Sequence, residues 1–430
     1  MSTQQASPGD LPATPLVART IGIDDPGPLL ALLPDGRSPD ELTSWLRGED
    51  GLVGWGRALV HQTSGASAFR DAERWWRDVV ATAVVRDEVD LPGTGPVAFG
   101  SFAFAEDSAR GSALVIPEVL VGRRGGRCWL TTVGTGSRLP GAPRVRPAAP
   151  PRAPRGVAFA DGALTGAQWT GAVAEAVGRI TTGALDKVVL ARDLEVSADR
   201  AVDVRWLLTR LSEQYPNTWV FAADGLLGAT PEMLVRLEKG LVTSRVLAGT
   251  IQRTGDDEHD LALAASLARS SKDLEEHEYA VRSVADALAP HCMSMNVPES
   301  PFVLHLTNVM HLATDVTGVL AGDVTSLCLA EALHPSAAVC GTPRPSAARL
   351  IAELEEMDRG RYAGPVGWVD ASGDGEWGIA LRCGEIDGGS PDRMRLFAGC
   401  GIVAGSDPEA ELAESDAKLV PMRDAFTATR

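Results

Sequence analysis

Cysteine and lysine are both scarce in this sequence of 430 residues, and each shortage carries information. The six cysteines are scattered and none forms a C-x-x-C pair, so neither a disulfide framework nor a zinc site is expected. No run approaches the ~20 apolar residues that a membrane-spanning helix needs. The first 15 residues lack the basic and apolar regions of a secretory signal. We therefore expect reduced thiols, no membrane association and a cytoplasmic location.

Positive charge is also in deficit. The 40 basic residues stand against 57 acidic ones, which gives a formal net charge of −17 at pH 7. A field of that sign repels phosphate backbones, so a nucleic-acid partner is not expected. The sequence contains no P-loop and no G-x-G-x-x-G that opens a helix after a strand, so a nucleotide cofactor is not indicated. With 44% hydrophobic residues, the chain has an ordinary globular composition.

Only four of the 40 basic residues are lysines: Lys187, Lys239, Lys272 and Lys418. Arginine stays protonated near neutral pH, whereas a buried lysine can lose its proton and act as a base. A lysine that is needed as a base cannot be exchanged for arginine, so the positions of these four are informative. The plainer alternative is that four lysines survive at arbitrary places in an arginine-rich protein.

The proline-rich segment 138–156 is the clearest break in the chain. Its closely spaced prolines cannot form a regular element, so we predict an exposed surface loop. Residues 1–15 are expected to form a flexible tail. Residues 16–137 contain short β-like runs and one helix near 68–84, whereas residues 157–430 carry sharper patterns.

The patterns after the break predict both helices and strands. Thr165 and Gln168 have the spacing of a capping box, which predicts a helix at roughly 166–181. Asp407 followed by Pro408 predicts the start of the last helix. Strands joined by short glycine-rich turns, with helices in separate blocks, favour an α+β fold with antiparallel sheets. The remaining helices are expected near 203–214, 256–290 (two helical segments), 323–333 and 345–356, and strands at 186–196, 218–223, 232–237, 241–247, 308–316, 364–370, 376–386 and 393–399.

Two of the expected helices each present a pair of carboxylates. Asp273 and Glu276 are three residues apart on one of them. Glu411 and Glu414 are three apart on the last helix, where Lys418 follows one turn later. Residues with this spacing share a helix face, and two such pairs suit a hard divalent ion such as Mg²⁺. Taken singly, each pair is more typical of a solvated surface near a helix N-terminus.

Three residues are candidates for acid–base chemistry or substrate contact. Lys187 lies in a β-branched strand; facing a closed pocket it would have a lowered pKa and could act as a base, while at a strand edge it would stay in water. Glu232 begins a short strand; if buried it could donate a proton to a leaving oxygen, although a turn glutamate is more often at the surface. His311 lies in an apolar run, where a core histidine is the default and a substrate contact the alternative.

Ten short motifs across residues 165–428 occur in an order that resembles the chorismate-utilising enzymes, and most closely their isochorismate synthase branch. No single motif is decisive, but ten in the family order make coincidence a poor explanation. Residues 20–140 match only in general style. The motifs are KVVLAR (187–192), TPEML (230–234), LAGT (247–250), KDxxEH (272–277), HLAT (311–314), LHP (333–335), GW (367–368), LRC (381–383), AGxGIV (398–403) and ExxExxxK (411–418).

The resemblance implies one large α+β unit, in which antiparallel sheets pack face to face with helices outside. The segments on both sides of the proline-rich loop would contribute to this unit. Chorismate would be the substrate and Mg²⁺ the only cofactor. Glu276 and Glu414 would hold Mg²⁺, with Asp273 and Glu411 supporting it through water.

The resemblance also implies a mechanism. Lys187, as a neutral amine, would remove a proton from the water that attacks C2 of the ring, and protonated Glu232 would donate to the C4 hydroxyl as it leaves. Water-using relatives often act alone, so a monomer is expected. The product, isochorismate, feeds menaquinone, catecholate siderophore and salicylate pathways. The implied substrate-binding residues are Gly249, Thr250, His311, Ala338, Tyr362, Arg382, Gly399, Gly401 and Lys418.

Several relatives remain as alternatives. Salicylate synthases share Lys187 and Glu232 and go on to eliminate pyruvate; they tend to have threonine where Ala338 stands, so Ala338 favours stopping at isochorismate. Ammonia-using relatives generally depart from the pattern at Lys187 and many use a glutaminase partner, so no glutaminase subunit is expected. The aminodeoxychorismate branch carries lysine where Ala248 stands. A catalytically silent chorismate-binding relative or a partner subunit is the non-enzymatic alternative.

Overall fold

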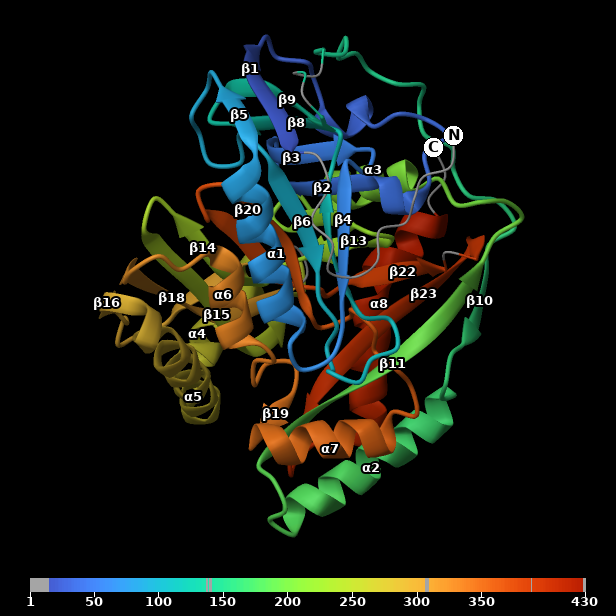
Figure 1. Ribbon diagram of the computed structural model, residues 1–430. Helices are drawn as coiled ribbons and strands as arrows, with labels where there is room; N and C mark the ends of the chain where they lie inside the picture. Colours follow the sequence, from blue (N-terminus) through green and yellow to red (C-terminus); the bar gives the residue numbers. More distant parts are fainter. Residues whose placement is uncertain (1–14, 137, 139–140, 306–308, 388, 428–430) are drawn as a thin grey trace.

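The computed structural model describes residues 15–136, 138, 141–305, 309–387 and 389–427 (Figure 1). Within these residues, the strands form two large sheets, one of 13 strands and one of 10. Each sheet contains strands from both sides of the proline-rich segment. The predicted α+β architecture with antiparallel sheets is confirmed. None of the described helices is long and apolar enough to cross a membrane.

The two sheets and the helices have the following bounds. The 13-stranded sheet runs in the order β10 (Ala158–Asp161), β11 (Lys187–Ser197), β23 (Ser390–Ile402), β22 (Cys383–Asp387), β13 (Leu226–Thr230), β12 (Trp219–Ala223), β2 (Leu42–Arg47), β3 (Asp50–Trp55), β8 (Val119–Arg124), β9 (Arg127–Thr135), β1 (Leu16–Ile23) and β5 (Val84–Asp87), with β19 (Gly341–Thr342) paired to β11. The 10-stranded sheet runs in the order β16 (Cys292–Asn296), β18 (Val309–Leu320), β15 (Leu241–Gln252), β14 (Met233–Glu238), β21 (Gly375–Ile379), β20 (Pro365–Asp370), β6 (Val97–Ser101), β7 (Ser112–Ile116) and β4 (Leu59–Thr63), with β17 (Phe302–His305) paired to β18. The α-helices are α1 (Ala68–Thr82), α2 (Gly166–Thr181), α3 (Val204–Gln214), α4 (Asp257–Leu267), α5 (Ser271–Leu288), α6 (Ser326–Leu333), α7 (Arg344–Leu354) and α8 (Pro408–Thr427), and short 3₁₀ turns lie at Leu29–Leu32, Pro39–Glu41 and Ala289–His291.

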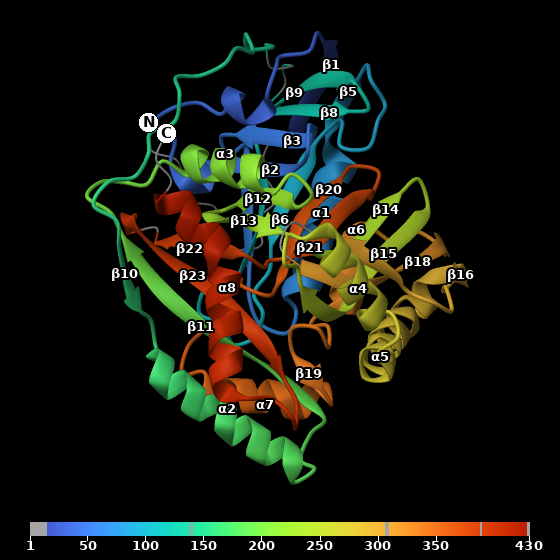
Figure 2. The same ribbon diagram turned by 180° about the vertical axis from the view of Figure 1, so that it is seen from behind.

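The main hydrophobic core lies between the two sheets. Trp45 and Phe221 from the 13-stranded sheet share one buried cluster with Phe99 and Trp377 from the 10-stranded sheet. A second cluster lies under the helices that cover the 13-stranded sheet, and it includes apolar side chains of both α3 and α8. Figure 2 shows α8 crossing this sheet at β22 and β23. Burial of apolar surface on both faces therefore fixes the 13-stranded sheet as the central layer of the molecule.

Helix α2 begins at the capping box that the sequence predicts. The backbone N–H of Gln168 donates to Thr165 Oγ1 at 3.3 Å, and the Thr165 N–H donates to Gln168 Oε1 at 3.0 Å. The apolar stripe of the helix then buries Trp169, whose indole N–H donates to the carbonyl of Ala191 in β11 at 3.0 Å. Helix α2 therefore packs against the strand that carries Lys187.

The predicted strand at 376–386 is wrong, because this segment contains two strands in different sheets. Strand β21 ends at Ile379 in the 10-stranded sheet, and β22 begins at Cys383 in the 13-stranded sheet. Between them Arg382 has a φ of +48°, a left-handed conformation that interrupts extended backbone. Each strand carries a partly buried glutamate among buried residues, Glu376 in β21 and Glu385 in β22, so the residue pattern alone could not show where the chain crosses.

Some short elements were not expected from the sequence. Strand β13 was missed, although the Asp224–Gly225 turn before it, with positive φ at both residues, is a two-residue hairpin signal. Strands β16 and β17 at the end of the 10-stranded sheet were missed as well, since each is only four or five residues long. Residues 141–156 of the proline-rich segment contain no helix or strand. All six cysteines, each within the described residues, are free, as predicted.

Candidate active site

Lys187 is the first residue of β11 and lies over the backbone of Gly401. Strand β11 pairs with β23 so that Val189 is opposite Gly401, and Lys187 itself pairs with Thr342 of β19. A Cβ atom added to Gly401 would lie 2.9 Å from Cε of Lys187 and 3.5 Å from its Nζ. The glycine therefore leaves the space through which the lysine side chain passes.

Glu232 lies where the chain crosses from the 13-stranded sheet to the 10-stranded sheet. It follows β13 and directly precedes β14, and its carbonyl accepts a hydrogen bond from the Ile379 N–H at 3.1 Å. The Thr230 hydroxyl donates to the Ile379 carbonyl at 2.6 Å. Ile379 ends β21, just before the chain crosses back to the 13-stranded sheet at Arg382. These hydrogen bonds therefore hold the two crossings next to each other. Glu232 and Arg382 thus reach the same region between the sheets.

The environment of Glu232 favours its neutral form. Burial raises the pKa of the Glu232 carboxyl to about 7, although the positive charges of Lys187, Arg382 and Lys418 oppose the rise. A carboxylic acid with such a pKa retains its proton in a large fraction of molecules at neutral pH. It can therefore donate a proton to a leaving oxygen, while an ordinary glutamate is ionised at this pH.

Partly buried Arg382 and buried Tyr362 lie next to the same region. Burial lowers the pKa of the Arg382 guanidinium, and Tyr362, Glu414 and Glu232 are among the nearby groups that raise it. The Tyr362 ring is 4% exposed and stacks on Phe397 with 5.2 Å between the ring centroids. Burial also raises the pKa of the Tyr362 hydroxyl above its ordinary value, so it stays protonated and can act as a hydrogen-bond donor.

A β-bulge brings Gly249 against α5 and beside His311. The register of β15 with β18 shifts between Ala248 and Thr250, and Gly249 has a φ of +75°. A Cβ atom on Gly249 would lie 3.2 Å from Cβ of Asp273. Burial lowers the pKa of His311 to about 4, with Arg382 and Lys418 adding to the effect. His311 is therefore neutral at pH 7.

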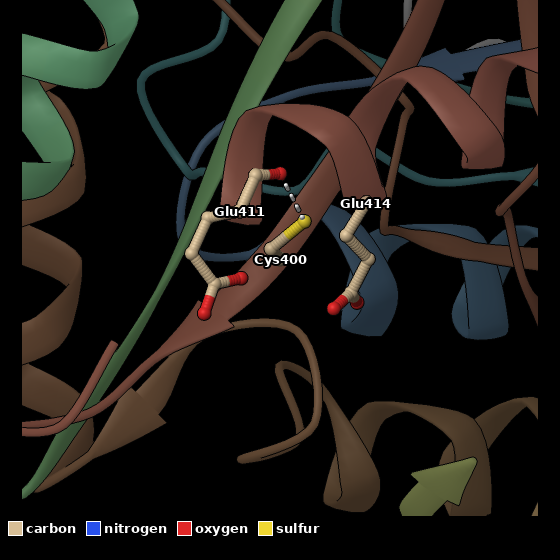
Figure 3. Close-up of side chains that lie close together, drawn as sticks. All are labelled: Cys400, Glu411 and Glu414. Carbon is tan, nitrogen blue, oxygen red and sulfur yellow. Dashed lines mark hydrogen bonds between the residues drawn. The ribbon is translucent and has the colours of Figure 1, made fainter. Parts of the chain in front are cut away.

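Two carboxylates of α8 meet at one point above β23. One oxygen each of Glu411 and Glu414 and the sulfur of Cys400 all lie within 4.8 Å of one another (Figure 3). The Nζ of Lys418 is 2.6 Å from Glu414 Oε1 and donates to the Gly399 carbonyl at 2.9 Å. Although burial opposes it, the charge of Lys418 brings the pKa of Glu414 below its ordinary value, so Glu414 is ionised.

The donors at this point fit a hard cation better than a soft one. Burial raises the pKa of the Cys400 thiol to about 12, and its sulfur donates to the Glu411 carbonyl at 3.4 Å. A protonated thiol is a poor metal ligand, so the carboxylates of Glu411 and Glu414 are the available donors. Carboxylate oxygens suit Mg²⁺. Asp273 on α5, a predicted metal residue, lies against the Gly249 bulge and is not part of the group formed by Cys400, Glu411 and Glu414.

The structure gathers many of the predicted site residues around the two chain crossings. Ala338 lies partly buried in the turn before β19, the short strand that pairs with Lys187. The side chains of Thr250 and Glu276 lie outside the described part of the structure; the backbone of Thr250 pairs with His311. The gathered residues are Lys187, Glu232, Gly249, His311, Tyr362, Arg382, Gly399, Gly401, Glu411, Glu414 and Lys418.

Cys400 is a neighbour of the site that the sequence interpretation did not single out. It stands between Gly399 and Gly401, where a motif position is variable, so no pattern marked it. Only the tertiary fold brings its sulfur next to the carboxylates of Glu411 and Glu414 on α8.

Comparison with known proteins gives a consistent result. The family described as "Chorismate binding enzyme" matches the chain at residues 12–137 and 146–427. Isochorismate synthase DhbC of Bacillus subtilis is 41% identical over 266 residues, which are 59% of this chain and 66% of that protein. The salicylate biosynthesis isochorismate synthase of Pseudomonas aeruginosa is 34% identical over 446 residues, covering 96% of this chain and 90% of that protein. The solved structure of MenF, the menaquinone-specific isochorismate synthase from Escherichia coli, superposes with a TM-score of 0.79 at 25% identity, covering 97% of this chain and 96% of that one.

Proposed function

This chain belongs to the chorismate-binding enzymes, and from that membership we propose that it is an isochorismate synthase. It converts chorismate to isochorismate: a hydroxyl group is added at C2 of the ring and the C4 hydroxyl is lost. The names of the two curated relatives described above support this activity, because both are isochorismate synthases and one matches over nearly the whole chain.

One structural observation carries the proposed chemistry. The amine of Lys187 at the start of β11 and the carboxyl of Glu232 between β13 and β14 reach one region, and a protonated Lys187 lowers the pKa of Glu232. The exchange of a hydroxyl between two carbons needs a base for the attacking water and an acid for the leaving hydroxyl. A lysine and a glutamic acid that keeps its proton in a large fraction of molecules at neutral pH supply this division of roles.

The proposed steps balance in atoms and protons. In molecules whose Lys187 amine is neutral, this amine accepts a proton from a water molecule whose oxygen bonds to C2. The ring double bonds shift as the C4–O bond breaks, and Glu232 donates its proton so that the C4 hydroxyl leaves as water. Lys187 ends protonated and Glu232 ends ionised, and exchange with solvent restores both groups.

Positive side chains receive the anionic substrate. Chorismate carries two carboxylates, and Arg382 and Lys418 provide fixed positive charge in a protein whose net charge is −17. A locally positive pocket can bind a dianion despite an acidic surface. We propose that Gly249, Gly399 and Gly401 contribute close backbone approach, because none of them has a side chain to obstruct the ligand.

We propose Mg²⁺ as the cofactor. Glu414 and Glu276 would hold it directly, and Glu411 and Asp273 through water. When bound, the ion would neutralise and orient the ring carboxylate of chorismate. We also propose that the enzyme acts in the cytoplasm as a monomer without a glutaminase subunit, because water and not ammonia is the nucleophile.

Incubation with chorismate and Mg²⁺ tests the proposed function, with products identified by chromatography and mass detection. Isochorismate should form with little pyruvate, and EDTA should abolish its formation. Stoichiometric pyruvate with salicylate would instead identify a salicylate synthase. Bound chorismate without turnover would identify a silent relative. Lys187→Arg should keep the fold and lose activity, and retained turnover would remove Lys187 from the role of base.

A further inference from the structure

One edge of β11 is completed by side chains and not by a strand. Strand β19 pairs with Lys187 and Val188, and β10 pairs with residues 194–197. Between these two short strands, residues 189–193 meet no strand on that edge within the described structure. Backbone groups that are buried without partners are costly, so something else must satisfy them.

Glu355 and Arg359 satisfy two of these groups, while the Trp169 indole N–H satisfies the Ala191 carbonyl and the Gly162 N–H satisfies the Asp193 carbonyl. Glu355 Oε1 accepts a hydrogen bond from the N–H of Ala191 at 2.7 Å. Arg359 donates from Nη2 to the carbonyl of Val189 at 2.8 Å. The two side chains also bind each other, with Arg359 Nε 2.8 Å from Glu355 Oε2 and Nη2 in contact with Oε1. Together they form a bidentate ion pair set against the backbone two and four residues beyond Lys187.

Arg359 also connects β11 to the turn that leads into β19. Its Nη1 donates to the carbonyl of Val339 at 2.9 Å. The next carbonyl, that of Cys340, accepts from the Val189 N–H at 2.9 Å. Strand β19 follows this turn and pairs with Lys187. The guanidinium therefore fixes two segments that converge on Lys187.

The ion pair is fully enclosed. Glu355 is 2% exposed and Arg359 is 3% exposed, and the guanidinium carbon lies 4.2 Å from the centre of the Phe104 ring. Buried ion pairs are weak sources of stability, because their desolvation offsets much of their attraction and packed apolar residues often serve as well. The guanidinium of Arg359 donates several hydrogen bonds in fixed directions, an arrangement that we call the fork. Its distinctive contribution is to fix the relative positions of the groups that it binds.

We propose that the Glu355–Arg359 ion pair positions Lys187 for its part in the reaction. It does so by holding the first residues of β11 in a fixed position. This inference rests on the proposed role of Lys187 as the base. Lys187 touches the reacting atoms, whereas Glu355 and Arg359 act through it and are positioning residues. A displacement of about 1 Å at a catalytic group can cost about 100-fold in rate, so loss of the fork should lower turnover.

The test compares Arg359→Lys with Arg205→Lys. Arg205 is also 3% exposed, and it donates to two carbonyls, those of Leu33 and Ala149, and to the carboxylates of Asp203 and Asp35. Lysine keeps the charge at both sites and loses the fork. We expect Arg359→Lys to lower kcat about 10- to 100-fold with the KM for chorismate within about twofold. Arg205→Lys should lower the Tm to a similar degree and leave kcat unchanged; equal losses of kcat in both variants would overturn the proposal.

A double-mutant cycle separates positioning from general destabilisation. In a Lys187→Gln background, Arg359→Lys should cause no further loss of the residual kcat, because its effect passes through Lys187. A further loss as large as in the wild-type background would overturn the positioning role alone. Full activity of Lys187→Gln would instead overturn the base role on which it rests.

Hydrogen exchange supplies a readout that is independent of activity. Arg359→Lys should speed amide exchange in residues 187–193, while Arg205→Lys should leave this segment as in the wild type. Unchanged protection of the segment in Arg359→Lys would contradict the proposal. If Arg359→Lys does not fold, Glu355→Asp takes its place, since it keeps the charge and withdraws the carboxylate from the Ala191 N–H by one methylene.

Discussion

The side chain of Lys187 occupies the space that Gly401 leaves open, with Cε 2.9 Å from where a Cβ on Gly401 would stand. The two residues come from neighbouring antiparallel strands and from motifs more than 200 positions apart in the sequence. A methyl group at this position would push the lysine side chain out of its observed path, because the neighbouring backbone of a paired sheet cannot move as easily.

Gly401→Ala should therefore lower kcat strongly and change the stability of the fold only slightly. We expect a loss of about 10-fold or more in kcat, from displacement of the amine, with a change in Tm of only a few degrees. Gly405→Ala is the matched control, because a Cβ there meets nothing within 4 Å. Steady-state kinetics and thermal denaturation of both variants give the comparison; wild-type kcat in Gly401→Ala would contradict the placement of Lys187.

The raised pKa of Glu232 predicts a pH-dependent cost of folding. Its pKa is about 7 in the folded protein against an ordinary value of 4.5, so the folded state holds the proton more tightly than the unfolded state. The resulting destabilisation is absent below pH 4.5, grows as the pH rises and is complete above about pH 7. Glu232→Gln should therefore raise the Tm relative to the wild type at pH 8 and much less at pH 5.

Thermal denaturation at both pH values checks this prediction. The exposed residue Glu299 offers a control, and Glu299→Gln should show no such pH-dependent gain. A Tm difference for Glu232→Gln that is the same at pH 5 and pH 8 would contradict the raised pKa. In the wild type, kcat/KM should also fall as the pH rises above about 7, since the proton donor is lost.

The α8 carboxylates predict a measurable affinity for Mg²⁺ alone. Glu414→Gln removes the carboxylate oxygens that face Glu411, so the Mg²⁺ affinity should fall about 10-fold or more. Glu409 lies exposed in the first turn of the same helix, and Glu409→Gln should bind Mg²⁺ as the wild type does. Calorimetric titration with MgCl₂ in the absence of chorismate measures both. Equal affinities in the two variants would place the ion elsewhere.

Cys400 should be dispensable for metal binding. Its thiol is protonated and directed at a backbone carbonyl, so it offers no charge to a hard cation. Cys400→Ala should retain the Mg²⁺ affinity and the chorismate KM of the wild type. A large loss of Mg²⁺ affinity in this variant would show that the sulfur ligates the ion and that the donor set is softer than we infer.

Much of the fold followed from local patterns. The capping box at Thr165 and Gln168 marked the start of α2, because side-chain caps act within one turn. The crossing at Arg382 could not be foreseen, since the residue pattern of this segment does not say which of two sheets each half will join. Strand β13, in contrast, was predictable, because the Asp224–Gly225 turn between it and β12 is a hairpin signal in the sequence.

The candidate site, like the fold, could be predicted from the sequence only in part. The motifs indicated Lys187 and Glu232, but nothing in the sequence showed that burial would raise the pKa of Glu232, because desolvation depends on residues from distant strands. The support of Lys187 by Glu355 and Arg359 was also hidden. These residues follow α7, and only the tertiary fold reveals that their side chains complete the edge of β11.

The central claim is that water supplies the new hydroxyl at C2 while the C4 hydroxyl departs. Turnover of chorismate in water enriched in oxygen-18, stopped at low conversion and analysed by mass spectrometry, tests this claim most directly. We predict isochorismate that contains one oxygen-18 atom, located at C2, with none incorporated in Lys187→Arg. Unlabelled isochorismate would mean that the hydroxyl migrates within the substrate, and it would contradict the roles of Lys187 and Glu232 together.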